Sequence, residues 1–210
     1  SINHIFKSID VCSMINAKMY TIHPGFLTDA ISESKSKSNY DFVWDDKKLL
    51  NINYEKCFNI LIGSVEKILN YASKKDVAIS IETEGSTNKK GHLLLQQPDE
   101  FLRILKYFNK VDLKFNVNIG HLNLASKVFN FKPKDFIDLI ADHIVSFELS
   151  HNDGKEDQHL PLIENKWYWN HILDKRFLNC YKILEYRNVE IKIIKESLKM
   201  IKEKIEKELI

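Results

Sequence analysis

Residues 150–162, SHNDGKEDQHLPL, bring two histidines and three acidic residues together directly after the apolar run HIVSF. Imidazole nitrogens and carboxylate oxygens are the side-chain ligands that hold zinc and similar divalent ions. In this segment the candidates are His151, Asp157 and His159. We therefore predict a metal site here, with further ligands supplied by other parts of the chain. The alternative is a polar loop that happens to contain two histidines.

The elements that would position such ligands can be read from the pattern of apolar residues. Five short apolar segments are typical of buried strands: KMYTI, VAISI, LKFNV, HIVSF and CYKIL, with a weaker sixth at HLPLI. Helical spacing of apolar residues marks segments 5–17, 54–75, 98–108, 132–140 and 189–210. Strands that alternate with helices predict a parallel sheet of the α/β class. The length of 210 residues favours a single domain, residues 1–210.

Each expected strand ends on or near a side chain that can bind a metal. In chain order these residues are His23, Glu82, Asn118 with His121, His151, and Glu185. In a parallel α/β barrel the carboxyl ends of all strands meet on one face, so residues far apart in sequence become neighbours there. Glu82 and Glu185 carry the most weight, because carboxylates are seldom buried unless they are paired or bound to a metal. Glu84, two positions after Glu82, is a supporting candidate.

Composition and charge exclude several other classes. A formal net charge of +2 predicts no strong attraction to nucleic acid or to a membrane surface. Three cysteines without CxxC spacing favour reduced thiols in the cytoplasm. The first residues lack the apolar core of a signal peptide, and no apolar run is long enough to span a membrane. A Ser/Lys-rich and then aromatic stretch, residues 32–46, predicts a loop that closes over a small ligand or else a mobile surface excursion.

The segments HPG, IETEG, NIGH, SHNDGKEDQH and EYRN, in this order, resemble the xylose isomerase-like TIM barrel superfamily. That superfamily contains sugar and sugar phosphate isomerases and epimerases, and the endonuclease IV branch of apurinic-site repair enzymes. The resemblance runs from about residue 2 to the end of the chain. It implies a TIM-barrel-like parallel β/α fold that is incomplete, with the first two strands of the barrel absent. Helices of the chain, or a second subunit in a homo-oligomer, would then cover the open sheet edges.

The resemblance also implies a set of metal ligands. The central site would use Glu82, Asn118, His151 and Glu185. In the three-zinc pattern of the endonuclease IV branch, a further ion would be held by His121, Asp157 and His159, and His23 would help to hold another. The family usually has Asp at the position of Asn118. An amide oxygen can bind a hard cation, but the lost charge should weaken that binding. The ion is expected to be divalent, with Zn²⁺, Mn²⁺, Mg²⁺ and Co²⁺ as the alternatives.

Three functions remain open at this point. The first is a metal-dependent isomerase or epimerase of a small sugar or sugar phosphate, with Glu82 and Glu185 transferring a proton on opposite faces of the substrate. The second is an endonuclease IV-like phosphodiesterase that uses zinc to cleave at apurinic sites. A degenerate barrel with a binding or accessory role is the third. The near-neutral charge favours a small carbohydrate over a nucleic acid as the partner.

Overall fold

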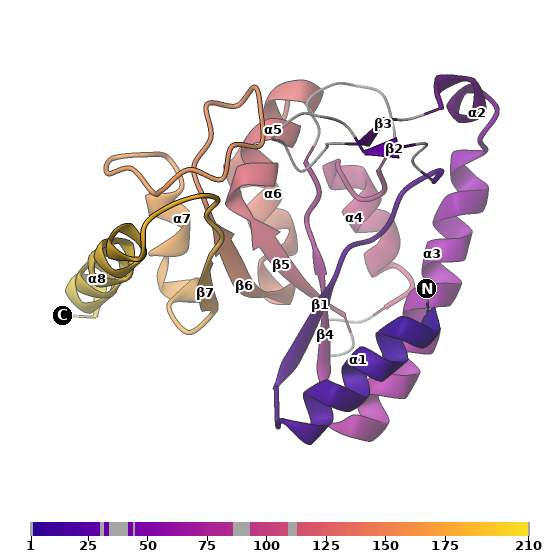
Figure 1. The fold of residues 1–210 in the computed structure, drawn as a ribbon, viewed down its shortest axis with the longest axis horizontal. Coiled ribbons are helices and arrows are strands. Elements are labelled where there is room, and N and C mark those ends of the chain that lie inside the picture. Colours follow the sequence, from indigo (N-terminus) through magenta and orange to yellow (C-terminus); the bar gives the residue numbers. More distant parts are fainter. Residues whose placement is uncertain are drawn as a thin grey trace.

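A computed structural model of the chain describes residues 2–29, 32–33, 42–43, 45–85, 93–108 and 113–209 (Figure 1). Five of its strands form one sheet, two form a small antiparallel pair, and eight α-helices surround them. In chain order the elements are α1 Ile2–Met14, β1 Met19–Ile22, β2 Ser32–Glu33, β3 Phe42–Val43, α2 Asp46–Leu50, α3 Tyr54–Ala72, β4 Ala78–Glu82, α4 Pro98–Leu105, β5 Lys114–Asn118, α5 Ile119–Phe129, α6 Pro133–Ile140, β6 Ile144–Leu149, α7 Trp169–Ile172, β7 Tyr181–Leu184 and α8 Ile191–Glu208.

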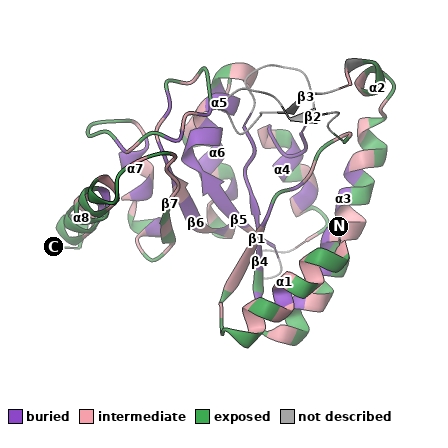
Figure 2. Cartoon of the chain, in the orientation of Figure 1, coloured by how far each residue is buried: buried purple, intermediate pink, exposed green. Residues whose placement is uncertain are grey.

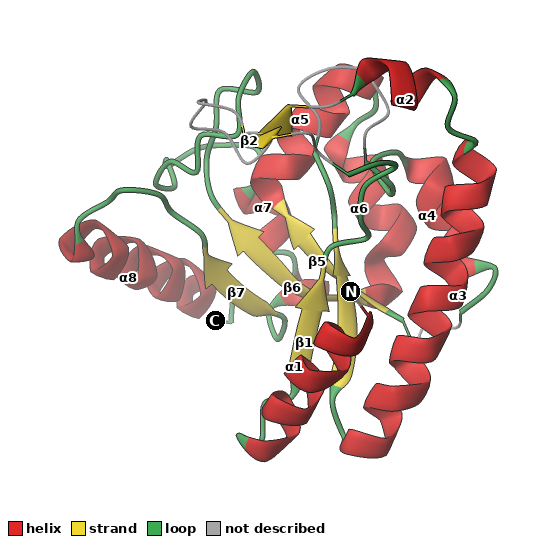
Figure 3. Ribbon diagram, turned by 45° about the vertical axis from the view of Figure 1, so that its right-hand side comes forward, coloured by secondary structure: helices red, strands yellow, loops and turns green. Residues whose placement is uncertain are grey.

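The main sheet has the order β1-β4-β5-β6-β7, and every neighbouring pair is parallel. The arrowheads of its strands all point toward the side where the long loops gather (Figure 3). The sheet curls into half of a barrel, which confirms the expected incomplete TIM-barrel fold. The five apolar segments are confirmed as its strands, whereas HLPLI contributes only a single bridge between Leu160 and His151. Helix α5, which begins directly after β5, was not recognised from the apolar pattern.

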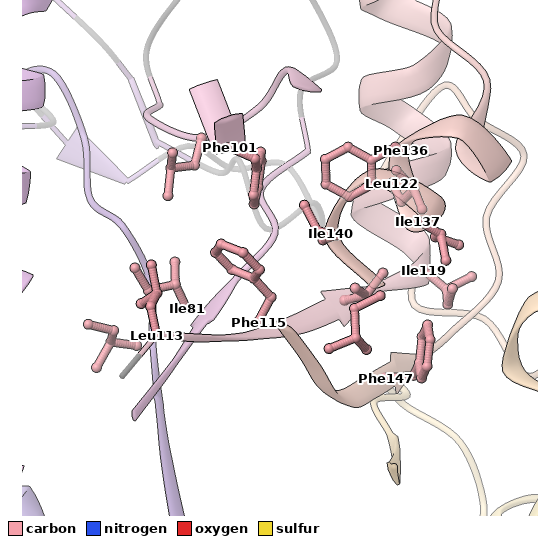
Figure 4. Packing of buried hydrophobic residues seen from close by; sticks show 14 of the residues in the cluster. Ile81, Phe101, Leu113, Phe115, Ile119, Leu122, Phe136, Ile137, Ile140 and Phe147 are labelled. Carbon is pink, nitrogen blue, oxygen red and sulfur yellow. The ribbon is translucent and has the colours of Figure 1, made fainter. Parts of the chain in front are cut away.

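The outer face of the sheet carries the hydrophobic core. Alternate residues of the middle strands point toward the helices, because side chains of a strand alternate between its two faces. Figure 4 shows Phe115 of β5 pointing toward Phe101 of α4, and Ile81 of β4 and Phe147 of β6 belong to the same buried cluster as residues of α5 and α6. The ring of Phe101 packs edge-on against Phe115, with centroids 5.1 Å apart, and against Phe136 of α6 at 4.8 Å. This packing holds the sheet and helices together and fixes the direction in which the other face points.

The inner face of the same strands is polar. Ser80, Asn116 and Ser146 are fully buried there, on β4, β5 and β6. The Ser146 hydroxyl donates to Asn116 Oδ1 at 2.7 Å, so these two buried groups are hydrogen-bonded to each other. The next inward positions along these strands, two residues later, hold Glu82, Asn118 and Glu148. A buried polar row therefore leads directly to the acidic residues at the carboxyl ends of the strands.

The two outer strands are paired on one side only within the described residues. On β7, Tyr181 and Ile183 remain 56% and 37% exposed. Helix α8 lies beyond β7 and buries only Ser197 and Ile201, so most of its surface is open (Figure 2). Helix α1 packs against α3 and β1 at the other edge. A second subunit that covers these edges stays a prediction. None of the described helices is both long and apolar enough to cross a membrane.

The loop predicted over residues 32–46 is described only in part. It contains the antiparallel pair of β2 and β3, in which Ser32 pairs with Val43. Helix α2 follows, and the Asp45 side chain accepts hydrogen bonds from two backbone N–H groups of its first turn. The rest of this loop lies outside the described residues, so its closure over a ligand stays a prediction.

Candidate active site

Three carboxylates meet around one amide at the carboxyl ends of β4, β5, β6 and β7. The side-chain nitrogen Nδ2 of Asn118 lies 2.9 Å from Glu82 Oε1 and 3.0 Å from Glu185 Oε2. It also lies 3.3 Å from Glu148 Oε2, and the same oxygen of Glu148 is 3.2 Å from Asn116 Nδ2. We call Glu82, Glu148 and Glu185, gathered around Asn118, the carboxylate group. The structure therefore brings together three of the four residues expected at the central site.

The fourth expected residue, His151, lies elsewhere. Its backbone forms the bridge to Leu160, and its ring lies 6.1 Å from the ring of Tyr168. Among the described residues, no hydrogen bond or ion pair joins the side chain of His151 to the carboxylate group. The structure places Glu148, three residues earlier and inside β6, against Asn118 instead, and metal binding by His151 stays a prediction. The signal for Glu148 was present in the alternation of Ser146 and Glu148 along the strand, between apolar residues.

Next to the carboxylate group, Asp157 holds two imidazoles. Its Oδ2 atom lies 2.8 Å from Nε2 of His159 and 3.5 Å from Nε2 of His121. All three side chains are almost completely buried. We call His121, Asp157 and His159 the histidine group. The two groups touch, because Nδ1 of His159 lies 3.2 Å from Glu185 Oε2 and Nδ1 of His121 lies 3.3 Å from Glu82 Oε1.

His23, at the end of β1, joins the site from its exposed side. Its Nδ1 atom is 2.7 Å from Glu84 Oε1, and its Nε2 atom is 3.5 Å from Glu82 Oε2. Its side chain is 60% exposed, whereas Glu82 and Glu84 are buried. Glu84, the supporting candidate, therefore contacts His23, and its part in the site stays a prediction.

Local backbone features explain how these residues come so close. Asn118 caps the N-terminus of α5, since its Oδ1 atom accepts the backbone N–H of His121 at 3.2 Å. A side chain at Gly85 would begin with a Cβ only 2.7 Å from the Cα of His121, so the Gly of IETEG lets α5 approach β4. His159 adopts a left-handed conformation, with φ +48°, which is uncommon for a residue other than glycine. Such a conformation is often found where a side chain is held for function.

The charges of the two groups are arranged differently. Burial and the neighbouring charges of Glu82 and Glu185 raise the pKa of Glu148 to about 8, so this acid keeps its proton near neutral pH. Burial opposes a charge on His159, but its contacts with Asp157 and Glu185 raise its pKa to about 9. Burial likewise opposes charge on Asp157, yet the two imidazoles hold the pKa of Asp157 below its usual range.

Burial and neighbouring charges also oppose each other at His121, Glu185 and His23. The pKa of His121 is well above its ordinary value, because its contacts with Asp157 outweigh its complete burial. The hydrogen bond to Glu84 raises the pKa of His23 to about 9. Burial alone would raise the pKa of Glu185, but its hydrogen bond with His159 holds it below the ordinary value. Imidazolium and carboxylate charges therefore alternate through the site.

The donor chemistry of the two groups fits a metal ion unequally. As they stand, the described His, Cys, Asp and Glu residues include no cluster of three or more arranged to hold an ion. In the histidine group, Nδ1 of His121 donates to the carbonyl oxygen of Thr83 at 2.9 Å, which turns Nε2 toward Asp157. A second hydrogen bond of this kind is what orients metal-binding histidines. Asp157 Oδ1 is buried without a hydrogen-bond partner among the described atoms. The histidine group therefore fits a divalent ion in its donor types.

The carboxylate group does not fit an ion in the same way. Asn118 points its NH₂ toward the three carboxylates, and an NH₂ group has hydrogens to donate but no lone pair for a cation. We expected Asn118 to bind a metal through its amide oxygen. That oxygen instead accepts the backbone N–H of His121 in α5 and so points away from the carboxylates.

A curled parallel β/α sheet with its polar side chains collected at the carboxyl ends of the strands defines a protein of the TIM-barrel type. More particularly, the chain belongs to the xylose isomerase-like TIM barrel family, whose model matches residues 1–204. Protein MJ1614 of Methanocaldococcus jannaschii is 26% identical over 192 residues, which make up 91% of this chain and 63% of that protein. The chain thus spans less than two thirds of the length of this relative.

Solved structures support the same fold. A D-tagatose 3-epimerase-like protein superposes with a TM-score of 0.72 at 18% identity, covering 98% of this chain and 68% of its own. The 3-keto-D-glucoside 4-epimerase YcjR of E. coli superposes with a TM-score of 0.66 at 6% identity, covering 96% and 70%. At such low identities these similarities establish the fold alone.

Proposed function

We propose that the protein is an isomerase or epimerase of a small carbohydrate, a sugar or sugar phosphate, and that it works by proton transfer next to a carbonyl group. The observation that carries this proposal is the carboxylate group, in which Glu82 and Glu185 both lie within 3.0 Å of one amide nitrogen. Two carboxylates so close together at the carboxyl ends of the strands could flank one substrate carbon. The names of the epimerases that share the fold point to the same chemistry.

Each residue of the carboxylate group has a distinct part in this reaction. A carbonyl group acidifies the adjacent C–H bond, so one carboxylate can remove the proton and a second can return it. Glu185 is half-exposed and has a lowered pKa, which makes it available as a base, while Glu82 is buried beside it. Glu148 holds its proton near neutral pH and can donate a hydrogen bond to the oxygen on which negative charge develops. Asn118 keeps all three acids together.

The proposed metal position is the histidine group. His121, Asp157 and His159 would hold a divalent ion, and two nitrogens with one carboxylate suit Zn²⁺ or Co²⁺ better than Mg²⁺. A bound ion there would polarise a substrate oxygen and so stabilise negative charge on it. The imidazolium protons that now face Asp157 would have to leave, so binding should release protons and weaken at low pH.

The proposal is tested by hydrogen exchange in deuterated water. A panel of ketoses that includes D-tagatose is incubated with the full chain, with and without Zn²⁺ or Co²⁺, and NMR measures deuterium at the carbon next to the carbonyl. We expect label to appear and the exchange rate to fall at least about 100-fold in Glu185→Gln, which keeps the shape of the side chain but removes the base. The control is Glu164→Gln, because Glu164 is exposed and lies outside the carboxylate group.

Two results would contradict this function. The first is that no ketose or ketose phosphate gains deuterium although the protein is folded, which would favour a barrel with a binding or accessory role. The second is exchange that continues at the same rate in Glu185→Gln.

A second function is favoured by one specific observation. The histidine group, with its two imidazoles on one aspartate oxygen, is the set of ligands that the endonuclease IV branch led us to expect. On this alternative, zinc would activate water to cleave a phosphodiester at an apurinic site. Zinc-dependent nicking of an abasic duplex, lost in His159→Gln and accompanied by no ketose labelling, would replace the isomerase proposal with this one.

A further inference from the structure

The orientation of the Asn118 amide is set by its two ends. Its Oδ1 atom accepts the backbone N–H of His121, as the N-cap of α5, and the side chain is fully buried. Turning the amide over would place its oxygen against the carboxylate oxygens of Glu82 and Glu185 and its NH₂ group against a backbone N–H. Both of these contacts are repulsive, because each would bring two groups of the same polarity together. The nitrogen is therefore held toward Glu82, Glu148 and Glu185.

The place that this nitrogen occupies is the one that a cation would need. Its neighbours are one oxygen from each of the three carboxylates, at 2.9, 3.0 and 3.3 Å. Buried carboxylates that converge on a point repel one another unless positive charge or hydrogen-bond donors lie between them. The two hydrogens of the amide supply those donors. A cation in the same place would have to displace the amide and break the cap of α5.

We propose that the amide nitrogen of Asn118 stands in for a metal ion, so that the carboxylate group is assembled and held without a cation. An ion that binds this chain then binds outside the carboxylate group. This inference does not depend on the proposed activity, because it concerns what holds the three acids together. It departs from the site expected in the family, in which Asp stands at this position and all the central residues are ligands.

The test is a titration of the chelator-treated full chain with Mn²⁺, a hard cation that prefers oxygen ligands. Calorimetry measures the number of sites, and circular dichroism checks the fold of each variant. We expect Asn118→Asp to gain one Mn²⁺ site that the wild type lacks, at least tenfold tighter than any binding by the wild type. The gained site should disappear in Asn118→Asp combined with Glu148→Gln.

The matched control is Asn116→Asp, which adds the same charge two residues earlier on the same strand. Asn116 is also buried and contacts Glu148, but it has no hydrogen bond to Glu82 or Glu185 among those described. We expect it to gain no Mn²⁺ site. Equal gains in both variants would show only a general effect of charge and would overturn the inference.

A second variant keeps the test decisive if Asn118→Asp does not fold. Asn118→Ala removes the donors and leaves a space among the acids, so its melting temperature should fall and Mn²⁺ should restore at least half of the loss. In the wild type, Mn²⁺ should not raise the melting temperature by binding to the carboxylate group. Wild-type Mn²⁺ binding that Glu148→Gln abolishes would overturn the inference. A folded Asn118→Asp protein without a new site would do so as well.

Discussion

The carboxylate group and the histidine group lie side by side at the same edge of the sheet, yet they are held together in different ways. The histidine group pairs one aspartate with two imidazoles, and all three side chains are buried. The carboxylate group gathers three acids around a single neutral amide, and the proton that Glu148 keeps relieves the repulsion among them. The histidine group combines charges of opposite sign, while the carboxylate group keeps one acid protonated and one half-exposed.

The contrast indicates different tasks. A buried ion pair is costly to disturb, as expected of residues that position others or bind an ion. A group of like charges is easily changed by a proton or a ligand, as expected of residues that react. The contact between His159 and Glu185 joins the two groups, and it lowers the pKa of the carboxylate that we propose as the base.

The largest effect is expected from breaking the histidine group. In Asp157→Ala, His121 and His159 lose the carboxylate that they share in a buried place, which should cost about 3 kcal/mol of folding free energy. Urea denaturation of the chelator-treated protein at pH 7 measures this loss. Glu185→Gln, which removes the half-exposed partner of His159, should cost less than about 1 kcal/mol. Equal losses in the two variants would show that the contrast between the groups is wrong.

Removing an acid from the carboxylate group should raise the stability of the protein at high pH, in contrast to a loss from the histidine group. The pKa of Glu148 is raised from 4.5 to about 8 in the folded protein, so between these values the folded state holds a proton that the unfolded state has released. Its contribution to stability is therefore lost as the pH rises from 4.5 through 8. Glu148→Gln removes this dependence and should be more stable than the wild type at pH 8.5, by roughly 2 kcal/mol after allowance for partial solvent exposure.

The measurement is urea denaturation from pH 4.5 to 9, in the presence of chelator. Glu164→Gln serves as the control, because an exposed acid should leave the pH profile unchanged. A Glu148→Gln variant whose stability falls with pH as steeply as that of the wild type would show that Glu148 is ionised in the folded protein.

Most of the fold could be predicted from the sequence, because its strands are short apolar runs between turns. All five strands of the sheet were found in this way, and their order follows from the βαβ pattern. Helix α5 was missed since it begins immediately after β5, with no intervening turn, and its cap is the strand residue Asn118. The strand expected at HLPLI forms only one bridge, because its pairing is limited to Leu160 and His151.

The site was predicted less completely, for a physical reason. Glu82 and Glu185 stand at strand ends, where a change from apolar to polar is easy to see, and both lie in the carboxylate group. Glu148 lies inside a strand, and only alternation shows which face it occupies. The sequence also cannot show which end of the Asn118 amide points inward. That depends on the backbone N–H of His121, three residues later.

The smallest effect is expected at His23, which belongs to neither group but contacts acids on the exposed side of the site. Its pKa of about 9 lies above the unfolded value of 6.5, so the stabilisation is complete below pH 6.5 and is lost as the pH rises through 9. Because the side chain is 60% exposed, solvent screens the pair, and His23→Gln should cost less than about 1 kcal/mol at pH 6 and nothing at pH 10. Thermal melting of both proteins at the two pH values, in about 0.05 M and about 1 M salt, measures this difference. The difference should be smaller in high salt, because salt screens the interaction between His23 and the acids. A cost that persists at pH 10 and in high salt would show that His23 stabilises the fold by packing and not through its charge.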